Sequence, residues 1–432
     1  MPEQLMQFKA TAPMKAIMTL MILLTLVSAW LAVRWYVGNT IAEYFHPEDH
    51  RLQTAQLAVT LAPNDPVPHW RLGNLAQTEL PPDQIGLVVA EYEKAVSLSP
   101  NDYRLWMELG GALEQAGEFD KAEKALRESV RLAPSYAQPR WYLGNLMLRT
   151  DRYDEGFAEL RRASEADSKF FPQLFNLAWQ LYQEDFGQLQ AAVGNAPAVR
   201  AEFSKYLVSH GRYDEGLRLW SSLTETEKKE NRSAADPIIG GLIGAQRYHQ
   251  AMNIWNEVAP GPAYDASVGH ILDRGFEDNL AHGPGAIFGW QVQSNSQVQI
   301  GIDAGKGHSG SRSLRLYFQV RSHIDTINVS QLVPVKPNTQ YDFECYLKTE
   351  RLESAETPVI LIVNAANEAG LAGSTPAPTG TNDWQRVALS FKTGDKTEAI
   401  KVKMVRNSCA ESPVCPIFGT VWYDDFDLKS RQ

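Results

Sequence analysis

The chain has 432 residues, and its 44% hydrophobic and 21% charged content is that of folded domains rather than long disordered segments. A chain of this length predicts two or three domains. Its formal net charge of −10 argues against a nucleic-acid partner, because binding to phosphates needs a basic surface.

The first element is an apolar segment near the N-terminus. Ala16 to Val33 contains no charged residue, and as a helix rising about 1.5 Å per residue it would extend roughly 27 Å, close to the thickness of a hydrocarbon core. Aromatic residues gather at its C-terminal end, as in an interfacial belt: Trp30, Trp35 and Tyr36. We therefore expect a cytoplasmic tail over residues 1–15 and a single-pass transmembrane anchor over 16–37.

A cleaved signal peptide is the alternative interpretation of this segment. Val27-Ser28-Ala29 offers the small residues found at cleavage sites. The apolar run is longer than a usual signal-peptide core and ends in aromatic residues, which favours the uncleaved anchor. Under both interpretations the chain after residue 40 lies outside the cytoplasm, in the periplasm or at the cell surface.

A repeat follows the apolar segment. Three pairs of landmark residues are each 34 positions apart: Gly110 and Gly144, Phe119 and Tyr153, and Pro100 and Pro134. This is the period of the tetratricopeptide (TPR) family, which the chain resembles at these positions. Leu109-Gly110 and Leu143-Gly144 match the Leu-Gly pair of the motif, and Trp106 matches its opening Trp. Each helical hairpin buries only part of its apolar surface, so neighbouring hairpins must stack.

Weaker repeats lie on both sides of this stretch. HWRLGNLA begins an earlier repeat, and RLQTAQLAVTLAPND before it is predicted to be a lone second helix. The turn at Arg212–Gly216 repeats that at Arg152–Gly156. Residues 186–198 look irregular, and 224–236 look like a polar connector. We expect five or six hairpins in an all-α, TPR-like solenoid over 48–262.

The concave face of such an array usually holds a peptide or protein partner. Its first helices supply the candidate contact residues, and the alternative for each is a solvated polar residue of no importance: Asn74, Met107, Asn145 and Asn176.

After the Pro- and Gly-rich segment 257–267, the apolar pattern changes from period 3.6 to period 2. Leu314, Leu316 and Phe318 alternate with polar residues, and similar runs recur between turn signals such as KPNTQ and TGDK. Eight or so strands in residues 268–432 predict an all-β sandwich of the jelly-roll type.

Several short motifs in this region resemble the carbohydrate-binding-module and galactose-binding-like jelly rolls. They are GHSGSRSLRL (307–316), VPVKPNTQYDFECYLK (333–348), an opening Gly275-Phe276-Glu277, and a terminal Asp-Asp-Phe-X-Leu from Asp424 to Leu428. The resemblance implies a structural Ca²⁺ where the first and last strands meet, with Glu277 and Asp424 as hard oxygen ligands. The alternative is that both are ordinary strand-end carboxylates.

Sugar binding needs flat aromatic and hydrogen-bonding side chains on one exposed face. The polar faces of the predicted strands supply the candidates: Tyr317, Gln319, Arg321 and Tyr346. An uninvolved solvent face is at least as good an interpretation. Three tryptophans are expected in the core: Trp290, Trp384 and Trp422. Asp424 and Asp425, as neighbours on a strand, are expected to face opposite ways.

The chain has three cysteines, and they are not grouped with histidines as in a zinc site. Cys409 and Cys415 are six positions apart and are predicted to form a disulfide in an oxidising compartment, with two reduced thiols as the alternative. Cys345 alternates with apolar residues and is predicted to be buried.

No nucleophile-elbow, P-loop or zinc-protease motif is found in the sequence, so we expect no enzymatic activity. We expect a membrane-anchored adaptor outside the cytoplasm, with repeats that bind a protein and a sandwich that binds a glycan or another partner, in a process such as envelope or exopolysaccharide assembly. The alternatives are a sandwich without sugar affinity and, least favoured, a glycan-modifying enzyme.

Overall fold

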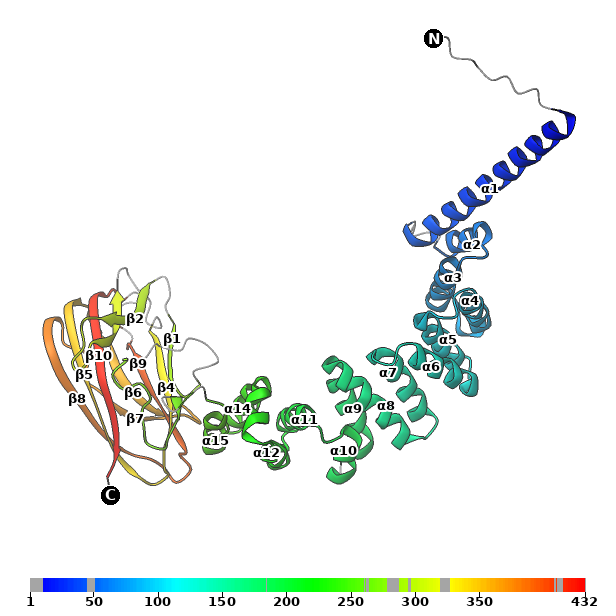
Figure 1. Ribbon diagram of the computed structural model, residues 1–432. Coiled ribbons are helices and arrows are strands. Elements are labelled where there is room, and N and C mark those ends of the chain that lie inside the picture. Colours follow the sequence, from blue (N-terminus) through cyan, green and yellow to red (C-terminus); the bar gives the residue numbers. More distant parts are fainter. Residues whose placement is uncertain are drawn as a thin grey trace, which may run out of the picture. The chain divides into compact units, whose positions relative to one another are not determined.

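The computed structural model describes residues 11–44, 51–183, 185–259, 261, 264–277, 287–293, 297–318, 327–407, 409 and 415–431. The chain divides into two compact units, Met1–Gly194 and Asn195–Gln432. The first unit is helical, and the second combines further helices with a β-sandwich (Figure 1). The predicted fold class, a TPR-like all-α region followed by an all-β sandwich and preceded by one apolar helix, is confirmed.

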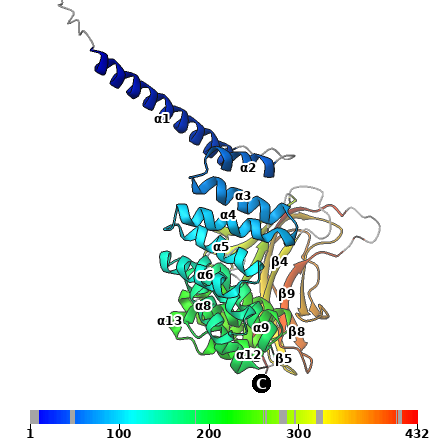
Figure 2. The ribbon, with the colours of Figure 1, turned by 90° about the vertical axis from the view of Figure 1, so that its right-hand side faces the viewer.

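The helices of the first unit pack as successive hairpins, which Figure 2 shows stacked from α3 to α8. Two short 3-10 helices precede α4 and α9. The bounds are α1 Ala12–Tyr44, α2 Arg51–Leu61, α3 Pro66–Glu79, η1 Pro82–Gln84, α4 Ile85–Leu98, α5 Tyr103–Gln115, α6 Phe119–Leu132, α7 Ala137–Arg149, α8 Tyr153–Ala166, η2 Ser168–Phe170, α9 Phe171–Tyr182 and α10 Phe186–Val193.

Local sequence explains where these helices begin and how closely they pack. Asp102 caps α5 by accepting the backbone N–H of Arg104 at 3.0 Å, which satisfies one of the unpaired donors of the first turn. A side chain at Gly144 would place its Cβ 2.7 Å from Leu160 Cγ and 2.9 Å from the carbonyl oxygen of Gly156. The recurring glycine therefore permits the close approach of the two helices in a hairpin.

The apolar helix continues into the first hairpin. α1 runs without a break from Ala12 to Tyr44, and its C-terminal part packs against α2. A Cβ at Gly38 would lie 2.9 Å from Ala62 Cβ, the same kind of close approach that Gly144 makes. The expectation that α2 is a lone second helix is therefore wrong. The segment 35–39 repeats the pattern of Trp70 to Asn74. Because an apolar run precedes this segment, the sequence alone suggests the end of a membrane anchor there.

The second unit begins with further hairpins: α11 Pro197–Ser209, α12 Tyr213–Ser221, α13 Glu225–Glu230, α14 Arg232–Gly244 and α15 Tyr248–Val258. The segment expected to be irregular and the segment expected to be a polar connector both contain helices. Residues 186–193 form α10, and residues 224–236 hold α13 and the start of α14. Thr224 and Glu227 form a capping box that starts α13 despite its polar sequence. Ala234 and Ala235 are fully buried in α14, so tertiary packing fixes this helix.

The sandwich has two five-stranded antiparallel sheets, which face one another in Figure 1. Sheet A has the order β1-β4-β9-β6-β7, and sheet B has the order β2-β3-β10-β5-β8. The bounds are β1 Trp290–Gln293, β2 Val298–Ala304, β3 Arg312–Phe318, β4 Asn328–Pro334, β5 Gln340–Glu353, β6 Val359–Asn364, β7 Gly370–Gly373, β8 Gly380–Lys392, β9 Ala399–Val405 and β10 Phe418–Ser430. The core between the sheets contains Trp290, Cys345 and Phe426, all nearly inaccessible to solvent.

The last hairpin and the sandwich share contacts. Asn256 of α15 exchanges two hydrogen bonds of 2.8 Å with the backbone of Ala266, and Trp255 donates its indole N–H to the carbonyl oxygen of Tyr264 at 2.8 Å. Leu332 of β4 packs against the apolar core of the helices. The segment before residue 268 thus marks a change of secondary structure, while helices α11–α15 belong to the same compact unit as the sandwich.

Candidate binding surfaces

A groove of about 650 Å³ lies on the first helices of successive hairpins in the first unit. α1, α3, α5 and α7 all contribute to its walls. The lining residues are Ala42, Glu43, Pro66, Val67, Trp70, Arg71, Asp102, Tyr103, Arg104, Leu105, Met107, Glu108 and Gln138. Apolar and aromatic side chains beside a few charged groups are the usual composition of a site that holds a peptide.

The charged groups of the groove differ in their partners. Arg104 is bound by Asp102, with Nη2 2.6 Å from Oδ2. Glu108 is half-buried, and burial raises its pKa above the ordinary value for a glutamate. Nε of Arg71 is buried without a hydrogen-bond partner in the described part of the chain. A buried donor left unpaired costs free energy, so this arginine destabilises the repeats slightly where it lines the groove.

The four predicted partner-binding residues occupy different environments. Met107 lines the groove and is also part of the hydrophobic core. The Asn145 side chain turns back to donate to the carbonyl oxygen of Trp141 at 2.8 Å. Asn74 is half-buried on α3, and Asn176 is exposed on α9. Their roles in binding stay predictions. Trp70, Arg71 and Glu108, which sequence reasoning did not select, line the groove; Trp70 and Arg71 directly precede the repeated Leu-Gly pair.

A second candidate surface is the outer face of sheet B. Strand pairing places Arg315, Trp422 and Lys348 side by side in one row across β3, β10 and β5. Tyr346 of β5 lies opposite Arg386 of β8 in the neighbouring row. Tyr317 also lies on this face, with the Arg315 guanidinium 5.8 Å from its ring centre. Of the predicted sugar-binding residues, the structure thus brings Tyr317 and Tyr346 to one face, while Gln319 and Arg321 lie outside the described residues.

The loop between β2 and β3 covers part of this face. The Lys306 ammonium lies 4.1 Å from the centre of the Trp422 ring, and the His308 ring stacks on Tyr346 with centroids 3.7 Å apart and planes tilted by 13°. His308 also meets the edge of Trp384 at 5.7 Å. One flat face of Tyr346 and of Trp422 is therefore occupied by the protein itself.

Trp384 does not lie in the core where it was expected. Trp422 is buried as expected, at 3% exposed, but outside the core between the two sheets. Val421 and Tyr423 point into that core, so Trp422 between them lies on the outer side of sheet B, beneath Lys306, and its indole N–H donates to Asp303 at 2.8 Å. Trp384 shares the side of Arg386, opposite the core-facing Val387, on the edge strand β8. Continuing the alternation of RVALSF (386–391) back to residue 384 places Trp384 on the same side as Arg386, so the sequence already indicated its outward position. Trp290 is in the core, as predicted.

Glu277 and Asp424, the predicted calcium ligands, both hold the β2–β3 loop. Glu277 Oε1 accepts the N–H groups of Ser311 at 2.8 Å and Arg312 at 3.0 Å, and these bonds lower its pKa. Asp424 Oδ2 accepts the N–H of His308 at 2.6 Å. Asp424 has no exposed surface, and burial raises its pKa to about 6.

The described residues do not by themselves form a calcium shell. The oxygens of Glu277 and Asp424 face N–H donors, and no group of three or more potential metal ligands converges among the residues that the structure describes. The pair fits calcium in one respect, because both side chains are hard oxygen donors beside Gly275. Residues 278–286, which follow Glu277, lie outside the described ranges.

Asp424 and Asp425 face the same loop, contrary to the expectation for neighbours on a strand. Asp425 accepts from the Ser309 hydroxyl and lies 2.6 Å from His308 Nδ1. The register between β10 and β5 shifts between Asp424 and Asp427, and Asp425 has a positive φ of 49°. This β-bulge breaks the alternation and brings both carboxylates to one side.

The predicted disulfide is present between Cys409 and Cys415. Arg406, 5% exposed, lies beneath it and donates to the carbonyl oxygens of Cys415 at 3.0 Å and Glu356 at 3.1 Å. These bonds tie the disulfide to the segment before β6. Cys345 is fully buried as predicted, and burial raises the pKa of its thiol.

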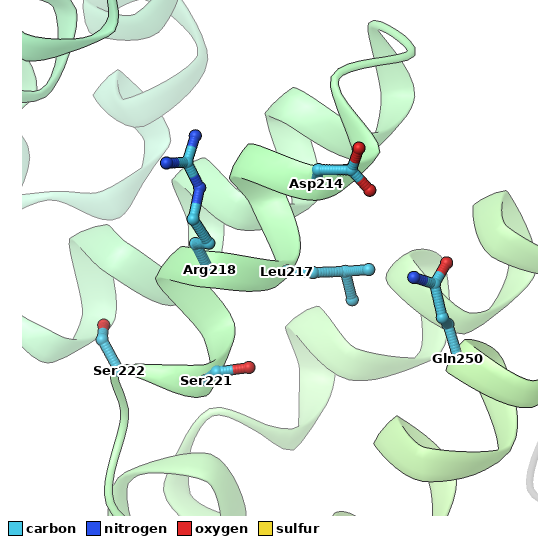
Figure 3. A pocket seen from close by; sticks show the side chains of 6 residues that line it. All are labelled: Asp214, Leu217, Arg218, Ser221, Ser222 and Gln250. Atoms are coloured by element: carbon cyan, nitrogen blue, oxygen red, sulfur yellow. The ribbon is translucent and has the colours of Figure 1, made fainter.

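A further hollow of about 480 Å³ lies between α12 and α15 (Figure 3). Leu217 and Gln250 face one another across it, whereas the Arg218 side chain points away. Asp214 at its rim is already paired with Arg247 at 2.6 Å. The residues that line it do not converge on a common point, so we assign it no ligand.

Comparisons with known families identify two kinds of domain in the chain. A tetratricopeptide-repeat model matches residues 89–137 and 114–169, and a carbohydrate binding domain model matches residues 268–406. The chain therefore carries TPR repeats and a C-terminal carbohydrate-binding domain. The repeat matches include the groove residues from Asp102 to Gln138, and the carbohydrate binding domain match includes the strands of sheet B other than β10. Both matched domains are non-catalytic, and together they give the chain the character of an adaptor.

Individual relatives are distant. The peroxisomal targeting signal receptor of Saccharomyces cerevisiae (strain ATCC 204508 / S288c) is 31% identical over 91 residues, which are 21% of this chain and only 14% of that protein. YrrB, a TPR protein with an unusual peptide-binding site, is 15% identical over 48% of this chain and 91% of its own, with a TM-score of 0.26. A CBM4 structure is 10% identical over 37% of this chain and 99% of its own, with a TM-score of 0.29.

Proposed function

We propose that this protein is a membrane-tethered adaptor outside the cytoplasm, whose TPR groove holds a segment of a protein partner and whose carbohydrate-binding domain attaches to a glycan. The observation that carries the proposal is the groove, because it joins apolar residues and charged groups over four helices. Envelope or exopolysaccharide assembly is the kind of process in which such a bridge is useful.

The groove can be tested with a displayed library of random peptides and the full chain in detergent. Tyr103→Glu places a charge on the half-buried aromatic wall of the groove and should abolish peptide binding, and Arg71→Ala should weaken it about tenfold. Lys124→Ala on α6 is the control, because this exposed residue is not among those that line the groove. Peptides that bind the Tyr103→Glu variant and the wild-type chain equally would disprove the assignment of the groove as a peptide site.

The support for tethering is α1. It is long and apolar enough to cross a membrane, and its most apolar part has no buried residues. The disulfide between Cys409 and Cys415 agrees with a location outside the reducing cytoplasm. Protease added to spheroplasts should digest the domains after α1 while α1 stays in the membrane fraction. Release of the intact chain by a salt wash would argue for cleavage of α1 or for a soluble protein.

The glycan site is proposed on the outer face of sheet B, around Trp384 and Tyr317. Both aromatic rings are half-buried on this face, and hydrogen-bonding groups such as Arg386 lie beside Trp384. A glycan array probed with the full chain in detergent tests it. Trp384→Ala and Tyr317→Ala should each weaken binding at least tenfold, whereas Lys403→Ala on sheet A should not. Equal binding by all of the variants would place the glycan elsewhere.

A sandwich without sugar affinity is the second candidate, and the β2–β3 loop favours it. Lys306 and His308 already cover the faces of Trp422 and Tyr346 that a sugar would use. His308→Ala uncovers Tyr346 and separates the two candidates. If neither the wild-type chain nor this variant binds any glycan while both remain folded, the domain serves a structural or protein-binding role.

We also propose that calcium can bind to Glu277 and Asp424. The support is that the two carboxylates are hard oxygen donors beside Gly275. Both also accept hydrogen bonds from the β2–β3 loop, so calcium would replace some of those bonds.

A further inference from the structure

The apolar segment and the first TPR hairpin are parts of one helix, with no linker between them. The uncharged run ends at Val33, and contacts with the hairpin begin at the next residue. Arg34 donates to the carbonyl oxygen of Thr60, and Trp35 donates its indole N–H to Asp65 at 2.7 Å. Because these side-chain contacts begin within one turn of the end of the uncharged run, the apolar part of α1 cannot rotate as a unit relative to its hairpin. The position of the membrane therefore sets the position of the hairpin.

The groove therefore begins close to the membrane surface. Glu43, which lines it, is ten residues beyond Val33 on the same helix. At about 1.5 Å per residue this is about 15 Å along the helix axis. The polar headgroup layer itself takes up roughly 5–8 Å of that distance. Little more than the width of one peptide chain remains between the headgroups and this end of the groove.

We infer that the groove receives the segment directly flanking the membrane span of another integral membrane protein. This inference rests on the proposed function, in which α1 spans the membrane and the groove binds a peptide. A segment attached to its own membrane span is held at the height of the groove, which raises its effective concentration there. A soluble protein would have to bring its segment against the headgroups, where its own bulk meets the bilayer.

The lining of the groove suits such a segment. Residues that flank a membrane span are rich in Trp and Tyr, which have apolar rings with a polar edge. Trp70 and Tyr103 offer apolar surface, and the Arg71 guanidinium in the lining offers donors to the backbone carbonyls of an extended chain. Glu43 and Glu108 are acidic, so a flanking segment with a lysine or arginine is preferred over an acidic one.

Photo-crosslinking in native membranes tests the inference. A photoreactive amino acid replaces Gln138, an exposed residue of the groove wall, or Lys124 on α6 as the control. Gln138 should crosslink to an integral membrane protein, and mass spectrometry should place the attachment within about ten residues of its membrane span. An attachment to a soluble protein, to a second copy of this chain or to a site remote from a membrane span would overturn the inference.

A spacer in α1 provides the matched variant. Seven polar helix-forming residues inserted between Val33 and Arg34 keep the helix face within about 20° and raise the groove by roughly 10 Å. The membrane-flanking adduct should fall at least fivefold, while a free peptide selected from the library should bind as before. If the adduct is unchanged, the inference fails although the groove still binds peptides. If Gln138 gives no adduct above the Lys124 control and no peptide binds, the proposed function of the groove fails as well.

Discussion

The indole N–H of Trp35 donates to Oδ2 of Asp65 at 2.7 Å, while Oδ1 of the same carboxylate accepts the N–H of Val67 at 2.9 Å. Asp65 is the N-cap of α3 and is 8% exposed. One carboxylate thus fastens the apolar helix α1 to the start of the next hairpin. Contacts of this kind connect the apolar part of α1 to the repeats.

Trp35→Phe should destabilise the first hairpin by about 1–2 kcal/mol, because it removes a hydrogen bond to a buried charged group. Asp65→Ala should cost about 2–3 kcal/mol, because it also removes the cap of α3. Hydrogen exchange of α2 amides in detergent measures both changes. Trp30→Phe is the control, since Trp30 is 61% exposed. Equal protection of α2 in all three variants would show that α1 does not stabilise the hairpin.

Gly38→Val should separate α1 from α2. A Cβ at Gly38 would lie 2.9 Å from Ala62 Cβ and 3.0 Å from the carbonyl oxygen of Ala58, and the backbone cannot yield as a flexible side chain can. We expect a loss of about 2–3 kcal/mol and weaker peptide binding in the groove. Gly86→Ala on α4 is the control, because a Cβ there meets no atom within 4 Å. A Gly38→Val variant with unchanged α2 protection would refute the close approach.

The stability of the repeats around α3 should fall as pH rises above about 6.5. His69 lies 2.6 Å from Glu91 Oε2 and 3.0 Å from the carbonyl oxygen of Pro63. Burial alone would lower its pKa, but these two bonds raise it above the ordinary value of 6.5. The folded state therefore binds the proton on His69 more tightly than the unfolded state does. The resulting stabilisation is complete below pH 6.5 and is lost as the pH rises through the raised pKa of His69 in the folded state.

Denaturation of the wild-type chain between pH 5.5 and 9 measures this effect, with an expected loss of about 1–2 kcal/mol. His69→Gln is the comparison, because its amide keeps a donor but does not titrate. The difference in stability between the two chains should shrink as pH rises. A difference that stays constant over this range would contradict a protonated His69.

Joint replacement of Cys409 and Cys415 by Ser should lower the stability of the sandwich by about 2 kcal/mol, the value expected for closing a short loop. The Arg406 donors would then lie beneath a less ordered segment. Thermal unfolding of the full chain checks this loss, with and without a reductant. The reductant should lower the transition of the wild-type chain and leave that of the double variant unchanged. A reductant effect on both would show that the change does not come from this disulfide, because Cys345 is the only cysteine left in the double variant.

Calcium at a concentration of about 100 Kd should stabilise the sandwich by about 2.7 kcal/mol if the carboxylate pair binds it. The measurement is thermal unfolding after treatment with a chelator and after calcium is restored. Glu277→Gln should abolish the response, whereas Glu368→Gln on sheet A should retain it. The absence of any calcium response in the wild-type chain would mean that N–H donors alone hold the β2–β3 loop.

Several elements were predictable because their patterns are local. The 34-residue spacing of Gly110 and Gly144 predicted the hairpins, since each glycine meets the second helix of its own hairpin. Alternation predicted that Tyr341, Phe343 and Cys345 would face the core. The same alternation also places Trp384 and Trp422 on the outer face of sheet B. The bulge at Asp425 could not be predicted, because it depends on strand pairing between β10 and β5.

The sequence by itself determined the apolar helix, the TPR repeats, the sandwich and the disulfide, because periodicity and spacing act between residues that are close along the chain. Only the tertiary structure decided which residues share a surface. It joined Trp35 to Asp65, assembled the groove from four helices, and laid Lys306 and His308 over Trp422 and Tyr346. These contacts depend on how hairpins stack and strands pair, and no local pattern encodes that geometry.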